Sequence, residues 1–486
     1  MPDHKKQYKD KVLNKAYEDF VNENKEYIEK ARNIFLKEKG LTFRDGTYLS
    51  PEYIWDWIFV KDAPEKYPNI FIGFEGYDLE SPSIVKFIYL YYSFYDRLIA
   101  ASDNGVLIVN RKETIPDMFY ALGSIPIRGG AGAALRHQRL SVVPDNFEAC
   151  GAGSAWAWKD NRIPFGAQVV PTGVHCYDTP NNALAVHRAG KVDIPIFYLD
   201  NPIGSGDAEW AIEYRVKTLR RAAEEIAKLN GATVDDERLR REIIIGNKVR
   251  KAVWRIYEVQ AESEQPPFTA HEFETIIHAG HNWAGEPEAF QEVLDGIAVE
   301  AKDRQSHKVH GTVIHKNPVR IFVGGACTHF RPLIGHTSGA VPVGVEWFLV
   351  PSHGSLNEEG DPFRALVEGS PLKSLTVPLE EHADWIVDRI KESRAEGFIY
   401  GYKWGCNFAS SAAHVITDVV KKKTGIPTLI METDFIGKQA NESGGGLTRV
   451  EAFIEILKQN KRSKGGVPEK RHIKKPNYNS AHAVGV

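Results

Sequence analysis

Short apolar runs alternate with amphipathic helical stretches along most of the chain. The runs are rich in Val, Ile, Phe or Tyr and bounded by Gly, Pro or Asp, which is typical of buried parallel strands. The predicted strands are residues 106–109, 167–170, 194–199, 319–323, 343–350, 397–400 and 428–431. Residues 412–423 have helical spacing, and a strand, a helix and a strand in succession favour a parallel sheet.

The sequence between and before these strands is mainly helical in pattern. Residues 233–236 resemble a capping box that opens a long helix through Leu239 and Trp254. The apolar stretch 84–95 is interrupted by Lys86 and rich in Tyr, so it predicts a buried or interface helix. Before it, residues 41–68 concentrate aromatic side chains. These are Tyr48, Tyr53, Trp55, Trp57 and Phe59, and such density predicts packing against another surface, most simply another subunit.

These patterns predict an α/β fold with two Rossmann- or flavodoxin-like parallel-sheet domains, joined by a helical segment and preceded by a helical, aromatic-rich N-terminal extension. A chain of 486 residues exceeds what one hydrophobic core usually supports. The expected parts are a helical N-terminal region at 1–100, a first α/β domain at 101–265, a helical connection at 266–316, a second α/β domain at 317–460 and a basic tail at 461–486.

Composition and charge narrow the class of protein. With 42% hydrophobic and 26% charged residues, the chain has the composition of an ordinary globular protein. The net charge of -3 gives no reason to expect a nucleic-acid partner. No apolar run has the length of a bilayer crossing, and the N-terminus lacks the apolar core of a secretory signal. We therefore expect a cytoplasmic protein without a membrane partner, with cysteines that are reduced, metal-bound or catalytic.

Three of the four cysteines lie in turns where a ligand site is expected. Cys150 and Cys176 fall in successive connections of the first α/β domain, and Cys406 follows the strand at 397–400 in the second. Ligands bind where such loops leave an open parallel sheet, and soft thiolates suit zinc or an iron–sulfur cluster. Two facing domains would close three thiolates around one cluster and leave one metal position for chemistry. For Cys327, a structural role and a ligand role stay equally open.

Several motifs beside these cysteines resemble one family. They are Gly405-Cys406-Asn407, residues 422–429, Glu432-Thr433-Asp434, residues 447–455, residues 145–150, Cys176-Tyr177-Asp178 with residues 193–197, and residues 115–123. In order and spacing they resemble the subunits of 2-hydroxyacyl-CoA dehydratases and benzoyl-CoA reductases, of the 2-hydroxyglutaryl-CoA dehydratase D-component type. The resemblance covers about residues 105–457 and is most specific at its C-terminal end.

The resemblance implies a [4Fe-4S] cluster held by Cys150, Cys176 and Cys406. It also implies a homologous second subunit in a heterodimer or larger assembly, an acyl-CoA substrate, and a separate iron–sulfur activator that hydrolyses ATP to deliver one electron. The implied reaction is one-electron reduction of the thioester followed by loss of water. A thioester resists such reduction, so the donor must approach the low end of the cluster range, about −700 mV.

Other functions compete with this one. A benzoyl-CoA reductase subunit would reduce an aromatic ring without losing water, a relay or scaffold subunit would serve a catalytic homologue, and a structural zinc module would contain no iron. His175 is either an unassigned loop histidine or a proton donor near the cluster. His271, His278 and His281 lack zincin spacing and are expected to be solvated or to cap a helix. The Walker and Gly-x-Ser-x-Gly patterns are absent, which argues against an ATPase and a serine hydrolase.

Overall fold

Two parallel sheets form the centre of the molecule. The computed structural model describes residues 18–60, 76–111, 114–128, 165–173, 194–202, 208–301, 304, 317–325, 339–346, 354–370, 378–403, 407–433 and 444–464. In this part of the chain the first sheet has the order β4-β3-β5-β6, with all neighbours parallel. Its strands are β3 (Ile108–Arg111), β4 (Ile125–Ile127), β5 (Ala167–Thr172) and β6 (Ile196–Asp200).

The second sheet repeats the strand order of the first. Its order is β10-β9-β7-β8, again parallel throughout. The strands are β7 (Val319–Gly325), β8 (Ala340–Glu346), β9 (Gly397–Lys403) and β10 (Thr428–Thr433). Numbered along the chain within each sheet, both read second, first, third, fourth. The predicted fold class is therefore confirmed, and the two halves share one topology.

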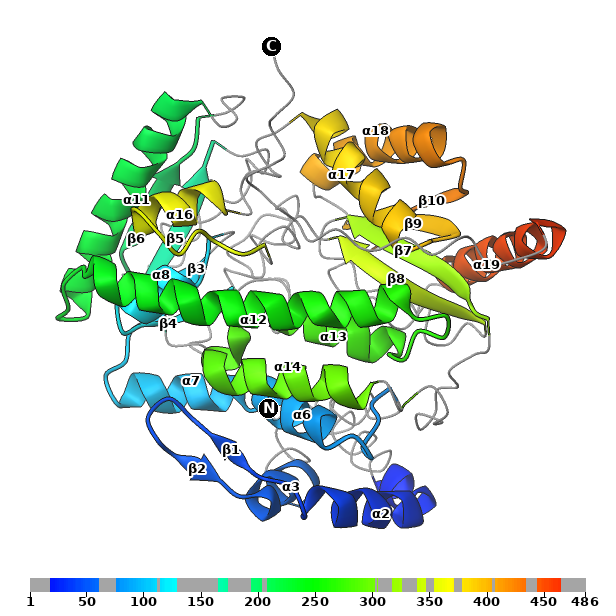
Figure 1. The fold of residues 1–486 in the computed structure, drawn as a ribbon, viewed down its shortest axis with the longest axis horizontal. Coiled ribbons are helices and arrows are strands. Elements are labelled where there is room, and N and C mark those ends of the chain that lie inside the picture. The colour runs from blue at the N-terminus through cyan, green and yellow to red at the C-terminus, as the bar shows by residue number, and fades with distance from the viewer. Residues whose placement is uncertain are drawn as a thin grey trace, which may run out of the picture.

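One long helix lies along both sheets (Figure 1). This is α12 (Asp236–Glu262), whose N-cap Asp235 accepts hydrogen bonds from the backbone of Glu237 and Arg238. Near its middle, Arg250 forms a fully buried ion pair of 2.8 Å with Asp117, at the start of α8 (Asp117–Ala121) in the first half. Near its end, the Tyr257 hydroxyl donates to the carbonyl of Val345 in β8 at 2.6 Å. The helix thus has direct contacts with both halves.

Shorter helices cover the sheets. In the first half, α11 (Glu209–Leu229) supplies Ala222, Ala223 and Ile226 to the core around Val109 and Val169. In the second half, α17 (Leu379–Glu392) and α18 (Asn407–Thr424) share a core with Phe322, Phe398 and Tyr400. The other face of this sheet receives α19 (Gly444–Lys464) through Val450, Ile454 and Leu457.

The chain returns to the first half after β8. Leu356 and the short helix α16 (Pro362–Glu368) bury their apolar side chains in the core of the first sheet. Asn247 of α12 holds this segment, because its amide donates to the Leu356 carbonyl at 2.9 Å and accepts from the Leu356 N–H at 2.8 Å. No pattern in the sequence indicated this crossing.

Replacing Asn247 by alanine is expected to lower the free energy of unfolding by about 2–4 kcal/mol, because buried polar groups of Leu356 lose their partner. The side chain of Asn247 is 1% exposed, so water does not replace it in the folded state. Urea unfolding would measure the loss, and hydrogen exchange should rise first in residues 354–370. The matched control is Lys248→Ala, one residue away and exposed. Equal stability of the two variants would contradict the role given to Asn247.

The N-terminal region forms a helical layer on α12 and the helices that follow it (Figure 1). Its elements are α2 (Lys25–Phe35), β1 (Leu41–Thr42), β2 (Tyr48–Leu49), α3 (Pro51–Phe59), α6 (Pro82–Tyr92) and α7 (Phe94–Asp103). The facing elements are α13 (Ala270–Ala279), the 3-10 helix η1 (Trp283–Gly285) and α14 (Pro287–Glu300). All of them except α7 contribute side chains to one continuous apolar core.

The expectation that the N-terminal aromatic residues pack against another subunit is wrong for most of them. Trp55, Trp57 and Phe59 are 2%, 5% and 8% exposed and pack in the chain's own core. Trp55 stacks on Phe59, and Trp57 meets Tyr89 of α6 edge-on. These large apolar surfaces are thus removed from water within one chain. The predicted buried helix in the apolar stretch is confirmed by α6.

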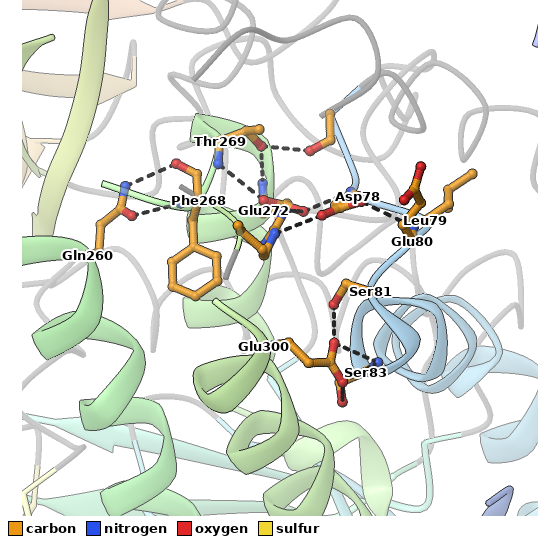
Figure 2. Close-up of polar contacts among 12 residues, drawn as sticks. Asp78, Leu79, Glu80, Ser81, Ser83, Gln260, Phe268, Thr269, Glu272 and Glu300 are labelled. Atoms are coloured by element: carbon orange, nitrogen blue, oxygen red, sulfur yellow. Dashed lines mark hydrogen bonds and ion pairs between the residues drawn. The ribbon is translucent and has the colours of Figure 1, made fainter. Parts of the chain in front are cut away.

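A buried polar cluster attaches the segment before α6 to α13 and α14 (Figure 2). Arg304 donates to Asp78 at 3.0 Å and to Glu272 at 2.6 Å, and all three side chains are at most 3% exposed. Glu272 also completes a capping box with Thr269 at the start of α13. Beside it, the Glu300 carboxylate accepts from the Ser83 hydroxyl at 2.6 Å and from Ser81, at the start of α6.

Candidate functional site

The predicted site residues themselves lie outside the described part of the chain. This holds for Cys150, Cys176, Cys406 and His175, and also for Cys327. The structure does describe the strands that lead to Cys176 and the adjacent His175, to Cys406 and to Cys327. β5 ends four residues before Cys176, β9 ends three residues before Cys406, and β7 ends two residues before Cys327. The site can therefore be analysed from the strand ends.

The strand order places these ends at the usual ligand positions of such sheets. In a sheet ordered second, first, third, fourth, the order reverses between the first and third strands, and ligands bind outside the carboxyl ends there. The reversal lies between β3 and β5 in one sheet and between β7 and β9 in the other. Cys176 and Cys406 follow the third strand of their respective sheets, which are equivalent positions in the two halves.

The first carboxyl edge, defined as the ends of β3, β5 and β6, is polar and tightly connected. Arg111, the last residue of β3, is 3% exposed and donates to the carbonyls of Thr114 and His281. Thr172 donates to Asp200 at 2.8 Å, which ties β5 to β6. The next residue, Gly173, has φ +65°, and a Cβ there would lie 1.7 Å from a backbone oxygen. Only glycine fits this exit toward Cys176.

A small hollow opens at the same edge. It lies between the ends of β3 and β6 and the helices α11 and α16 and has both polar and apolar lining residues. Its lining residues are Thr114, Ile115, Met118, Leu199, Asp200, Asn201, Arg215, Thr218, Leu219, Leu366, Val367 and Ser370. The returning segment after β8 therefore contributes to the surroundings of the first edge.

The second carboxyl edge, defined as the ends of β7, β8 and β9, combines glycines with a buried acid–base pair. Gly325 has φ +108°, and a Cβ on it would lie 1.9 Å from the Gly401 carbonyl oxygen. Glu346, the last residue of β8, is 0% exposed and lies 3.2 Å from Nε2 of the buried His382 in α17. Sequence reasoning missed this pair. The only signal was a glutamate inside an apolar predicted strand.

The N-terminus of helix α18 lies at the second edge, and its helix dipole favours negative charge there. The helix begins at Asn407, directly after Cys406. The positive end of a helix dipole stabilises negative charge and lowers the pKa of a thiol placed there.

The two edges are anchored on the same helix a short distance apart. Asp117, just beyond β3, pairs with Arg250, whereas Val345, at the end of β8, accepts from Tyr257. Arg250 and Tyr257 are seven residues apart on α12, which corresponds to about 10 Å along its axis at 1.5 Å per residue. Burial, followed by the charge on Glu346, raises the pKa of Tyr257 well above its usual value, so this phenol stays protonated and keeps donating.

The expectation that His281 is solvated or caps a helix is wrong, because His281 is 5% exposed and its backbone carbonyl accepts from Arg111. His271 and His278, for which the same was expected, are half-buried residues of α13. Within the described ranges, no group of three or more His, Cys, Asp or Glu side chains is arranged to hold a metal ion. None of the described helices combines the length and apolar character needed to cross a bilayer.

Comparison with protein families places most of the chain in a described family. A family model described as 2-hydroxyglutaryl-CoA dehydratase, D-component, matches residues 116–457, which is more than two thirds of the chain. The matched range begins just before α8 and includes β4 to β10. It leaves out β3 and all elements of the N-terminal helical layer, from α2 to α7. Among curated proteins, none matches the chain.

Proposed function

The chain belongs to the 2-hydroxyglutaryl-CoA dehydratase D-component family, and we propose that it is the iron–sulfur subunit of a radical 2-hydroxyacyl-CoA dehydratase served by an ATP-dependent activator. The family consists of dehydratase-type enzyme components, so a subunit of such an enzyme is the general function. The proposal adds the cluster, the activator and the reaction. The single observation that carries it is the family match, which covers the second sheet and all of the first sheet except β3. It includes the third strand of each sheet, and these strands lead to Cys176 and Cys406.

The proposed ligands of a [4Fe-4S] cluster are Cys150, Cys176 and Cys406. Chain length keeps two of these cysteines near described strand ends. A fully extended residue spans at most about 3.6 Å, so Cys176 lies within about 14 Å of Thr172. By the same argument Cys406 stays within about 11 Å of Lys403. The glycine exits of β5 and β7 and the start of α18 suit a thiolate site between the edges. When bound, the cluster would supply single electrons at very low potential.

The chain's own residues would position the substrate and move protons around that site. His175, next to Cys176 in the sequence, is the proposed proton donor of the first edge. The D-component family implies a partner component in a multi-subunit enzyme, and we take this partner to be a homologous subunit. A separate iron–sulfur activator and a cytoplasmic location complete the proposal.

The proposal predicts product chemistry that is straightforward to test. The anaerobically purified complex, activated with ATP, should convert a 2-hydroxyacyl-CoA to the enoyl-CoA with release of water. Mass spectrometry of the thioester would show the loss of 18 mass units that one water carries. The matched control omits the activator and should leave the substrate unchanged.

Other outcomes of this test would assign the other functions. A dienoyl thioester formed from benzoyl-CoA, with no elimination from hydroxyacyl substrates, would identify a ring reductase. A chain that keeps its iron but shows no substrate-dependent change in its EPR spectrum would be a relay subunit. Colourless protein with zinc and no iron would refute the iron–sulfur assignment.

A further inference from the structure

The Glu346–His382 pair is buried at the second carboxyl edge, and the burial of two ionisable side chains there needs an explanation. Both side chains are almost fully buried, at 0% and 2% exposure, and Nε2 lies 3.2 Å from Oε1. Burying two ionisable groups costs desolvation that their attraction repays only in part. Buried pairs of ionisable side chains in a cleft or at a sheet edge are therefore candidates for a functional role. The pair also stands at a carboxyl edge, where ligands of parallel sheets bind.

An irregularity in β8 directs Glu346 to this position. Ile321 pairs with Pro342, whereas the next residue, Phe322, pairs with Gly344, so Val343 is an extra residue in the strand. A bulge of this kind changes which face the following side chains occupy. Because of it, Glu346 lies on the face covered by α17, where His382 meets it. Bulges are frequent next to active sites for the same reason.

The neighbouring strand β7 lies directly against the carboxylate. Gly324 of β7 lies beside Glu346 in the sheet, and a Cβ on Gly324 would lie 3.6 Å from Oε2. The Gly325 N–H lies 3.5 Å from the same oxygen. The titratable groups facing Glu346 in the described chain are His382 from α17, Tyr257 from α12 behind the strand, and Tyr400 in the same row on β9.

We propose that Glu346 and His382 form a proton-transfer pair that serves the second carboxyl edge. This inference rests on the proposed function. Loss of water breaks the C2–O bond and a C3–H bond, so one proton leaves carbon and one joins the departing hydroxide. The single electron that starts the elimination is recovered when the enoyl product forms, so the pair needs to move only protons. The pair acts on the substrate through the groups that contact it, as a positioning and relay element.

The test uses the complete activated complex with uncharged polar variants of the pair. Glu346→Gln and His382→Gln keep hydrogen-bonding capacity but cannot pass a proton in the same way. We expect both to keep the iron content and EPR spectrum of the wild type, while kcat falls about 100-fold or more, the usual contribution of acid–base catalysis. The pH dependence of kcat should flatten, and deuterium at C3 of the substrate should slow the variants more than the wild type.

Matched controls separate this role from a structural one. Glu380→Gln and His414→Gln change the same residue types at exposed positions on α17 and α18 and should leave kcat and its pH profile unchanged. If the pair only supported the fold, Glu346→Gln would keep the wild-type rate, and that result would overturn the proposal. Wild-type protein that holds iron but eliminates water from no hydroxyacyl-CoA would overturn the proposed function and this inference together.

Discussion

Cys406→Ala is expected to remove the cluster iron and acid-labile sulfide from the anaerobically purified protein, and Cys150→Ala and Cys176→Ala should do the same. A cluster held by three thiolates keeps only two when one is replaced, and two ligands do not hold four irons. The described strand ends give the reason to include both halves, since Cys176 and Cys406 follow equivalent strands of the two sheets. Iron and sulfide analysis with low-temperature EPR would measure the loss.

The fourth cysteine is the control for this experiment. Cys327→Ala removes a thiol of the same kind from the exit of β7 and should leave iron, sulfide and the EPR signal at wild-type levels. Full iron in any of the three ligand variants would contradict the ligand set. Loss of iron from Cys327→Ala would show that the first and third strands of the second sheet both supply ligands. Dehydration activity should disappear with the iron in every variant that loses it.

The strands were predictable from the sequence because their signal is local. Each of the seven predicted strands overlaps a strand of the structure. The helix predicted at residues 412–423 lies within α18. Short apolar runs between Gly, Pro or Asp are typical of buried parallel strands. β4 was missed because it is three residues long and contains Pro126, so it has neither the length nor the composition of such a run.

Contacts between distant segments were not predictable in the same way. The return of α16 to the first sheet depends on Asn247, and an asparagine inside a helix carries no information about a partner more than 100 residues away. The aromatic N-terminus gave an ambiguous signal, because burial in its own core and burial against a subunit use the same side chains. Trp55 and Phe59 are buried in the core of their own chain.

The sequence predicted where the site lies in the fold, but it did not reveal all the side chains that lie there. Parallel topology fixes which edge collects the loops, so the expectation of a site at the carboxyl ends followed from the strands alone. Glu346 and His382 were not recognised, because they are 36 residues apart in the sequence and the bulge that aligns them leaves no mark on it. Sequence patterns locate strand ends, whereas the pairing of buried charges requires coordinates.

Arg304→Met is expected to lower the free energy of unfolding by about 3–5 kcal/mol, the usual cost of removing one partner from a buried ion pair. The substitution keeps much of the side-chain volume but leaves Asp78 and Glu272 buried without their cation. Urea unfolding followed by circular dichroism would measure the change. The control Arg255→Met breaks an ion pair whose arginine is 51% exposed and should cost no more than about 1 kcal/mol.

The dependence of this loss on pH identifies its cause. Burial raises the pKa of Glu272 above its ordinary value, although Arg304 opposes the shift. A carboxyl with a raised folded-state pKa favours the native state at low pH, and this contribution is lost as the pH rises through that value. Removing Arg304 raises the pKa further, so the deficit of Arg304→Met should be smaller at about pH 5 than at about pH 7.5. Adding Asp78→Asn and Glu272→Gln to this variant should restore most of the stability and abolish the pH dependence. A deficit that is equal at both pH values would mean that lost packing, and not uncompensated charge, destabilises the variant.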